Sequence, residues 1–216
     1  MPRPCEVFRL GRRDYRETYT LQRELVETRI QKSDSDAIIV VEHPPVFTIG
    51  RNGSLQHLLM PEHINKQRIP VCEVDRGGSI TYHGPGQLVL YPILDLRFHG
   101  QDLHKLIHFY EAAIIAVLKD FGIDGRRISQ WPGVWVGEEK IAFIGIGVRR
   151  WITYHGIALN LDPDLKYFDW IIPCGIKNKR VTSMAKLLGS APQMETVCRG
   201  LLRHLADEFQ LDYDGF

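Results

Sequence analysis

The sequence predicts an α+β (α/β) fold in which helices flank a mixed, largely antiparallel sheet. Three stretches repeat apolar residues at the 3.6-residue period of an amphipathic helix. Between them lie short apolar runs, several of which are joined by turns too short for a parallel crossover. Because strands come partly in runs and the helices are few, we expect the helices to cover the sheet rather than to alternate with each strand.

The helices are expected at residues 14–32, 102–121 and 192–209. Asp14 and Glu17 stand at the spacing of a capping box, although Asp replaces the usual Ser or Thr. The second helix is the clearest, because apolar residues from Leu103 to Phe121 follow the helical period and Gly122 supplies a stop. The last helix also gathers its apolar residues on one face.

Strands are expected at residues 37–42, 70–75, 88–98, 133–136, 140–149 and 154–161, and residues 46–50 are a candidate continuation of the first. The segment His43-Pro44-Pro45 closes the first strand, since proline cannot donate to a ladder. Short turns join the last three strands, which favours an antiparallel meander.

Length and composition indicate one domain that spans residues 1–216. The chain has 216 residues, of which 44% are hydrophobic and 25% charged, as in typical globular proteins. Its net charge of +1 gives no bulk attraction to nucleic acid. No apolar run approaches the roughly 18–20 residues that span a bilayer, and the first residues lack the apolar core of a signal peptide. We therefore expect a cytoplasmic protein without nucleic-acid or membrane partners.

The cysteines are Cys5, Cys72, Cys174 and Cys198, which lie far apart and form no C-x-x-C pair. This spacing disfavours both a zinc finger and a disulfide framework. We interpret Cys72, in a strand, and Cys198, near the apolar face of the last helix, as packing residues. Any cysteine chemistry would then use a single thiol.

Cys174 has the most reactive context of the four. It lies between Pro173 and Gly175, and cationic residues follow it closely in the sequence. Positive charge nearby favours the thiolate, which is the reactive form of cysteine. The alternative is a small buried side chain without reactivity, the commoner role of a lone cysteine.

The most unusual segment is residues 76–88, in which glycines, a proline, an arginine and a histidine precede an apolar run. Glycine lets a backbone approach a ligand closely or turn with positive φ. The segment matches neither phosphate-binding glycine pattern, so a nucleotide is not its obvious ligand. It is either an ordinary glycine-rich hairpin or a loop that presents backbone and side chains to a small molecule.

Lys140 begins a strand that is expected to be buried. It is either a solvated turn lysine or a partly desolvated amine that can accept a proton near neutral pH. Gly145 and Gly147 remove side chains from one face of that strand, which would leave room for a ligand.

Histidines stand at the ends of two of the segments that we single out. His83 ends the polar part of residues 76–88, and His155 begins a small-residue strand that ends at Asn160. Either histidine suits acid–base work or hydrogen bonding. No carboxylate or cysteine stands at ligand spacing, so we expect no metal site.

Together these segments resemble the lipoyl(octanoyl) transferase family. Residues 76–95 are similar to its signature R-G-G-x-x-T-Y-H-G-P-G-Q-L-V-x-Y-P-I-x-D-L. The later motifs Lys140-Ile141-Ala142, His155 to Asn160 and Pro173-Cys174-Gly175 follow in the family's order, and residues 43–50 match an earlier one. The resemblance spans residues 43–183.

This resemblance implies a single catalytic acyltransferase domain with the fold of lipoate and biotin protein ligases. Family members transfer an octanoyl group from acyl carrier protein to a specific lysine of lipoyl domains. By residue-for-residue match, Cys174 would carry the acyl group as a thioester and Lys140 would assist, with His155 and Asn160 in support. The implied acyl pocket comprises Arg76, Gly77, Gly78, Ser79, Ile80, Thr81, Tyr82, His83, Phe143, Ile144, Gly145, Gly156, Ile157 and Ala158.

The implied partners are acyl carrier protein, the lipoyl domains of 2-oxoacid dehydrogenase E2 subunits and the glycine cleavage H protein, and no cofactor is expected. Arg149, Arg150, Lys177, Lys179 and Arg180 are candidates for a basic docking surface. Two alternatives stay open. An ATP-dependent lipoate or biotin ligase would share the fold and would not need Cys174, and a non-catalytic acyl-binding module would use it only structurally.

Overall fold

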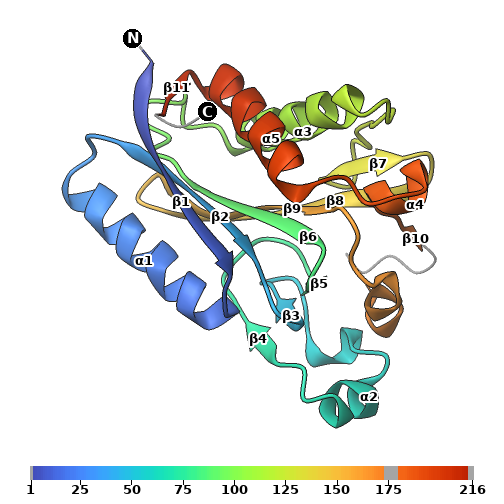
Figure 1. The fold of residues 1–216 in the computed structure, drawn as a ribbon. Helices are drawn as coiled ribbons and strands as arrows, with labels where there is room; N and C mark the ends of the chain where they lie inside the picture. Colours follow the sequence, from blue (N-terminus) through green and yellow to red (C-terminus); the bar gives the residue numbers. More distant parts are fainter. Residues whose placement is uncertain (1, 173–179, 214–216) are drawn as a thin grey trace.

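The computed structural model describes residues 2–172 and 180–213 and builds them around a mixed sheet (Figure 1). The order of its main strands is β10-β8-β9-β6-β2-β1-β11, and β7 pairs with β8. Antiparallel pairs join β8, β9, β6 and β2, and parallel pairs join β1 to β2, β1 to β11 and β10 to β8. The strands are β1 (Arg3–Arg12), β2 (Asp36–Glu42), β6 (Gln87–Ile93), β7 (Val134–Val136), β8 (Glu139–Arg149), β9 (Ile152–Asn160), β10 (Arg180–Val181) and β11 (Leu211–Asp212).

A smaller sheet has the order β4-β3-β5, with β3 (Val46–Ile49) between β4 (Val71–Glu73) and β5 (Ile80–His83). The sequence suggested that residues 46–50 continue the strand before them, and this was wrong. Pro44 and Pro45 lack the N–H that would carry the ladder through the bend. The chain therefore leaves β2 and pairs elsewhere.

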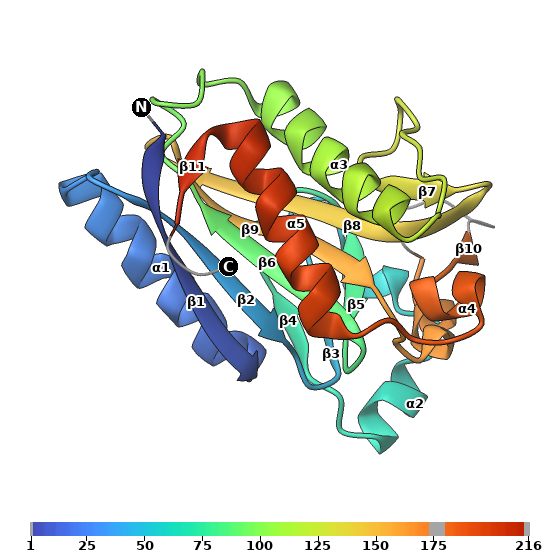
Figure 2. The same ribbon diagram turned by 45° about the horizontal axis from the view of Figure 1, so that its top comes forward.

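The three predicted long helices are confirmed as α1 (Tyr15–Gln31), α3 (Leu103–Asp120) and α5 (Met194–Phe209). Asp14 caps α1 and Asp102 caps α3, each accepting backbone N–H groups of the first turn. Figure 2 shows α3 and α5 side by side on one face of the large sheet, with α1 on the opposite face. The remaining helical segments are η1 (Leu55–His57), α2 (Pro61–Lys66), η2 (Leu165–Trp170) and α4 (Met184–Leu188).

Both faces of the large sheet are buried. Successive side chains of β2 point to opposite faces and pack into two different cores. Ile38 packs into the core under α3 and α5, whereas Ile39 and Val41 pack into the core shared with the smaller sheet. All three side chains are at most 2% exposed. The near-continuous apolar run of this strand is what a sheet covered on both faces requires.

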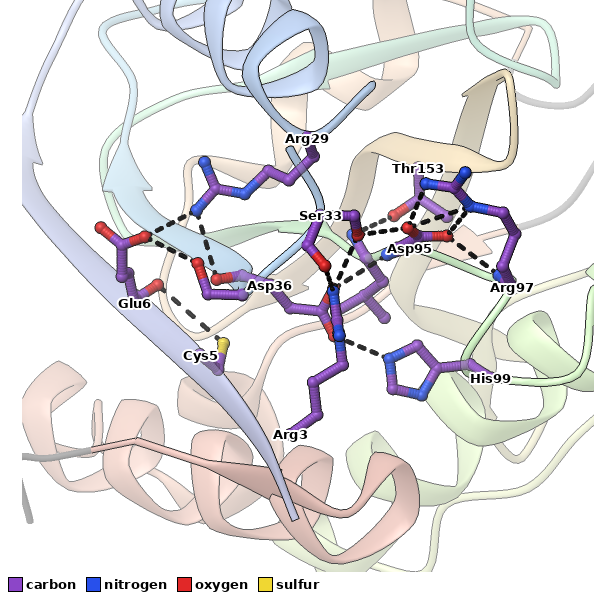
Figure 3. Close-up of polar contacts among 12 residues, drawn as sticks. Arg3, Cys5, Glu6, Arg29, Ser33, Asp36, Asp95, Arg97, His99 and Thr153 are labelled. Atoms are coloured by element: carbon purple, nitrogen blue, oxygen red, sulfur yellow. Dashed lines mark hydrogen bonds and ion pairs between the residues drawn. The ribbon is translucent and has the colours of Figure 1, made fainter. Parts of the chain in front are cut away.

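A buried polar cluster anchors β1 (Figure 3). The sequence analysis did not predict this strand. Asp36 is fully buried and pairs with Arg3 Nε at 3.1 Å and His99 Nε2 at 2.7 Å. It also accepts the backbone N–H of Asp95 at 2.9 Å. The Asp95 carboxylate in turn accepts hydrogen bonds from Arg97 and Ser33. Polar side chains therefore fix the start of β1 against the turn after β6.

The predicted strand at residues 88–98 is shorter in the structure, because β6 ends at Ile93. The predicted meander of β7, β8 and β9 is confirmed by its antiparallel pairs. Within the described ranges, no helix combines the length and the apolar character needed to cross a membrane.

Candidate active site

A cavity of about 780 Å³ lies between the smaller sheet, β8, β9 and the start of α3. Residues 76–79 form one of its walls, and the strands β8 and β9 form another. The predicted residues that line it are Arg76, Gly77, Gly78, Ser79, Ile80, Thr81, His83, Lys140, Phe143, Ile144, Gly145, His155, Gly156, Ile157 and Ala158. The structure thus brings together segments that the sequence separates by 80 residues.

Tyr82 and Asn160 are the predicted residues within the described ranges that do not line the cavity. The Tyr82 ring stacks on Tyr167 with centroids 4.7 Å apart, on the other side of β5. Asn160 is fully buried, accepts Gln87 Nε2 at 2.8 Å and donates to the Thr182 carbonyl at 3.0 Å. Neither side chain therefore forms part of the cavity wall.

Lys140 is a buried lysine, with 4% of its surface exposed. Its Nζ donates to the Pro132 carbonyl at 2.7 Å and lies 5.3 Å and 4.9 Å from the ring centroids of Trp135 and Phe143. Gly133 has φ +118°, and a Cβ there would lie 2.6 Å from Lys140 Cε. The solvated-turn interpretation of this lysine is wrong, because carbonyl and aromatic groups surround the amine.

Cys174 lies outside the described residues, as do Lys177 and Lys179. The described chain on either side is well anchored at the cavity. The Ile172 N–H donates to the carbonyl of His57 at 2.9 Å, and His57 lines the cavity. On the other side, β10 pairs with Glu139 and Lys140, and the Thr182 N–H donates to the Lys140 carbonyl at 2.9 Å.

The glycines of β8 and β9 serve a different purpose from the expected one. A Cβ at Gly145 would lie 2.7 Å from Arg76 Cδ, and one at Gly147 would overlap the Tyr154 ring. At Gly156 the obstacles are the Leu90 carbonyl oxygen at 2.5 Å and Pro92 Cδ at 2.6 Å. These three glycines therefore make room for other parts of the protein. Gly145 and Gly156 also line the cavity, whereas Gly147 does not, and the space expected beside Gly147 is filled by Tyr154.

Gly77 and Gly78 do leave open space. The nearest atom to a Cβ at Gly77 would be the Ile146 carbonyl oxygen at 3.6 Å. Gly78 has φ +86°, which favours glycine, and its nearest neighbour would be Arg76 Nη1 at 3.4 Å. Open space of the kind that the sequence analysis expected beside glycines therefore lies next to Gly77 and Gly78.

Arg76 is buried and holds the loop to the smaller sheet. Its Nη2 donates to the carbonyl and hydroxyl oxygens of Thr48 at 2.7 Å and 2.8 Å, and its Nη1 donates to the Gly77 carbonyl at 3.0 Å. The Gly77 N–H donates to the Ile146 carbonyl at 2.8 Å, which attaches the loop to β8 as well. A buried guanidinium that donates to three oxygens is a rigid support.

Two buried histidines are neutral at physiological pH. Burial lowers the pKa of His83 to about 3 and that of His43 to about 4. His83 Nδ1 donates to the side-chain oxygen of Gln87 at 2.7 Å. A continuous chain of hydrogen bonds then leads from His83 through Gln87 and Asn160 to Thr182.

His155 lies at the other end of the cavity from Lys140. It faces Ile146 across the β8–β9 ladder. Ile146 follows Lys140 by six residues on β8, which corresponds to about 20 Å along the strand. The φ of His155 is +56°, its N–H donates to Gln22, and its Nε2 is 3.2 Å from Asp75 Oδ1. Burial lowers the pKa of His155. Hydrogen bonds to Asp75, of which the one from His155 has the largest effect, hold the pKa of Asp75 well below its usual range. This histidine therefore supports the far wall.

The other three cysteines are buried, as the packing interpretation of Cys72 and Cys198 requires. Burial raises the pKa of Cys5 to about 12 and that of Cys198 to about 11. Both thiols are therefore protonated and unreactive at neutral pH. Among the described residues, no three His, Cys, Asp or Glu side chains gather as metal ligands would.

Several cavity residues were not among the predicted site residues. They come from the start of α1, from residues 51–57, from β6, from the start of α3, from residues 130–132 and from β8. They are Tyr15, Arg51, Asn52, His57, Val89, Tyr91, Leu103, Ile107, Gln130, Trp131, Pro132, Ile146 and Val148. The local hint that could have been followed is a histidine, His57, four residues after Gly53.

Comparison with known sequences gives consistent matches over almost the whole chain. The family model of the lipoyl protein ligase A/B catalytic domain matches residues 14–206. An octanoyltransferase of Solibacter usitatus is 46% identical over 211 residues, or 97% of this chain and 95% of that protein. One of Caldicellulosiruptor bescii is 44% identical over 194 residues, or 88% of this chain and 85% of that protein.

Solved structures share the fold at low sequence identity. A bi-partite lipoate protein ligase, solved with its E2 lipoyl domain, from Thermoplasma acidophilum has a TM-score of 0.80 at 16% identity, covering 99% of this chain and 87% of its own. Lipoate-protein ligase A bound with ATP has a TM-score of 0.75 at 16% identity, covering 100% and 89%. A biotin protein ligase from Aquifex aeolicus has a TM-score of 0.55 at 15% identity, covering 97% and 70%.

These likenesses confirm the predicted fold, a mixed sheet flanked by helices of the lipoate and biotin protein ligase type. The family model and the full-length relatives agree on one group of enzymes. The chain therefore belongs to the lipoyl protein ligase A/B catalytic-domain family and, within it, to the octanoyltransferases, which are acyltransferases.

Proposed function

We propose that this chain transfers an octanoyl group from acyl carrier protein to a lysine of lipoyl domains, through a thioester on Cys174 assisted by Lys140. The acceptors would be lipoyl domains of 2-oxoacid dehydrogenase E2 subunits and the glycine cleavage H protein. Residues 1–216 would act as one catalytic domain in the cytoplasm. The reaction would be the first step in making protein-bound lipoate.

The observation that carries this proposal is that the described residues on both sides of the cysteine segment pair with the cavity wall that holds the buried Lys140. Lys140 lines the cavity and pairs with β10, which follows residues 173–179. Ile172, which precedes them, is bonded to His57 of the same cavity. Both described flanks of the cysteine segment are thus paired with cavity-lining residues, which supports a reaction centre at the Lys140 end.

The chemistry is an exchange of acyl groups in two steps. Lys140 would accept the Cys174 proton, and the thiolate would attack the thioester carbonyl and expel the thiol of the donor, which takes a proton. The acceptor amine would then attack the new thioester, forming the amide and releasing the Cys174 thiolate. Lys140 would take up and return the proton in each step, so that no cofactor is needed.

The apolar part of the cavity suits a medium acyl chain. Phe143, Ile144 and Ile157 line it beside the open backbone of Gly77 and Gly78. Burying the chain contributes about 0.8 kcal/mol per CH₂, or roughly 5 kcal/mol for an octanoyl group before ordering costs. Chain length would therefore influence binding strongly.

The test is the intact mass of the protein after mixing with octanoyl-loaded carrier protein in the absence of acceptor. We expect one added octanoyl group that hydroxylamine removes and that Cys174→Ala lacks. Lys140→Ala should slow acylation by about 10²-fold or more, and Lys140→Arg should not restore it, because arginine keeps its proton. Lys186→Ala is the matched control, since this lysine is exposed and its amine pairs with Glu139.

Two outcomes would contradict the proposal. Transfer to a lipoyl domain without any adduct on the protein would mean direct transfer and would reduce Cys174 to a pocket residue. Transfer that requires ATP and free octanoate would instead identify a ligase of the type that shares the fold. The same mixtures distinguish both outcomes, because ATP and the acceptor are added separately.

A further inference from the structure

His57 is held in one tautomer by the loop that carries it. Its Nδ1 accepts the backbone N–H of Ser54 at 3.2 Å and lies 3.0 Å from the hydroxyl of Ser79. A backbone N–H can only donate, so Nδ1 must present its lone pair. The proton of the neutral ring is therefore on Nε2, whereas an imidazolium would set two N–H groups against each other.

This leaves an N–H donor in the cavity wall. His57 lines the cavity and is partly exposed. Its hydrogen bonds within the described chain use Nδ1 and the backbone, and none uses Nε2. A side-chain donor of fixed tautomer beside a cavity is suited to an acceptor on a bound molecule.

The backbone around His57 runs beside the chain that leads to Cys174. The Ile172 N–H donates to the His57 carbonyl at 2.9 Å, Leu58 bridges to Ile171, and the Leu59 N–H donates to the Trp170 carbonyl at 2.8 Å. Ile172 is the last described residue before the segment that contains Cys174 in the sequence. The backbone of His57 is therefore fixed beside the described chain that leads to the proposed nucleophile.

We propose that His57 Nε2–H donates a hydrogen bond to the carbonyl oxygen of the octanoyl group and stabilises the oxyanion formed in both transfer steps. This role rests on the proposed function. When a nucleophile forms its bond to the carbonyl carbon, the C=O electron pair moves to oxygen, and the bond from His57 strengthens. Collapse of the intermediate returns the pair and expels the thiolate. No proton leaves His57, whose Nε2–H acts only as a hydrogen-bond donor.

Two substitutions of His57 distinguish the effect of its Nε2–H donor from that of its Nδ1 contact with Ser54. His57→Asn keeps an oxygen near the Nδ1 position for Ser54 and removes the Nε2 donor, whereas His57→Gln offers an amide N–H near Nε2. Rapid-quench intact mass gives the rate of acylation of Cys174. We expect His57→Asn to lower this rate about 10²–10³-fold with little change in KM for the carrier protein, and His57→Gln to recover part of it. His63→Asn, on the exposed side of α2, is the matched control.

A spectroscopic readout distinguishes substrate contact from loop support. With a ¹³C-labelled octanoyl carbonyl, the acyl-enzyme should absorb at a lower infrared frequency in the wild type than in His57→Asn, because hydrogen bonding weakens the C=O bond. Equal frequencies would overturn the proposal even if activity fell, since His57 would then only hold its loop. Wild-type acylation rates in His57→Asn would overturn it as well. Failure of the wild type to form any adduct would instead remove the thioester route itself.

Discussion

At the scale of single residues, the site depends on side chains whose surroundings fix their protonation or position. Lys140 is enclosed by a carbonyl and two aromatic rings, and His57 is set in one tautomer by Ser54. Arg76 donates to three oxygens that belong to Thr48 and Gly77. Each group is preorganised before any substrate arrives, which is the property that electrostatic catalysis needs.

Gly145→Ala should damage both stability and activity. The new Cβ would lie 2.7 Å from Arg76 Cδ, the middle of a side chain that its hydrogen bonds prevent from moving away. We expect a loss of about 1–3 kcal/mol in the free energy of unfolding, measured in urea. Gly77→Ala is the control, since its Cβ has no neighbour closer than 3.6 Å. Equal stabilities of the two variants would contradict the role assigned to Gly145.

Asn160→Ala should loosen the chain next to Lys140. Its side chain joins Gln87 to the Thr182 carbonyl, and the Thr182 N–H is bonded to the Lys140 carbonyl. Removing the buried amide leaves unpaired polar groups, at a cost of about 1–3 kcal/mol in unfolding free energy. The rate of octanoyl adduct formation should fall with it. Asn65→Ala, exposed on α2, should change neither quantity; unchanged stability in Asn160→Ala would argue against the link.

At the scale of elements, the first strand is held by polar contacts as well as by its strand pairs. β1 lies between β2 and β11 with parallel partners on both sides, and its first residue pairs with buried Asp36. Charged residues occupy every third position of this strand, from Arg3 to Arg12, and they obscured it in the sequence. The second view shows β1 and β11 adjacent at the end of the sheet that α3 and α5 cover (Figure 2).

Asp36→Asn should destabilise the attachment of β1. The carboxylate is fully buried between Arg3 and His99, so removing its charge leaves Arg3 without its partner. We expect a loss of about 3 kcal/mol in unfolding free energy and faster amide hydrogen exchange in β1. Asp34→Asn is a close control, because the Lys32–Asp34 pair is exposed and solvent screens such pairs. Similar losses in the two variants would contradict the importance of burial.

At the scale of the whole molecule, the neutral buried histidines set the pH dependence of stability. An unfolded histidine has a pKa near 6.5, whereas burial lowers that of His43 to about 4 and that of His83 to about 3. The unfolded state therefore binds more protons between these values. Stability is fully present above about pH 6.5 and is lost as the pH falls toward 4.

This effect is measurable between pH 7.5 and pH 5, above the range in which carboxylates titrate. Each histidine should cost about 2 kcal/mol of unfolding free energy at pH 5. His43→Asn, which can still donate to the Arg13 carbonyl, should lose about 2 kcal/mol less over this interval than the wild type. The measurement is urea unfolding at both pH values, with His63→Asn as control. Parallel losses in wild type and His43→Asn would show that His43 is protonated in the folded state.

The sequence by itself determined the features that depend on neighbours along the chain. Amphipathic periods and caps located α1, α3 and α5, because helical hydrogen bonds and helical faces are local. The long motifs around Arg76, Lys140 and Cys174 identified the family, since so many matching residue types in one order do not occur by chance. They also selected most of the cavity wall.

Only the tertiary structure decided what depends on distant partners. It placed β3 in a second sheet and β1 between two parallel neighbours, because strand pairing is set by packing across the whole chain. It showed that the space beside Gly145 belongs to Arg76, a residue 69 positions earlier. It also brought His57 to the cavity and fixed its tautomer. The physical reason is common to all of these: a side chain's chemistry follows from the atoms around it, and those atoms come from parts of the chain that only folding brings together.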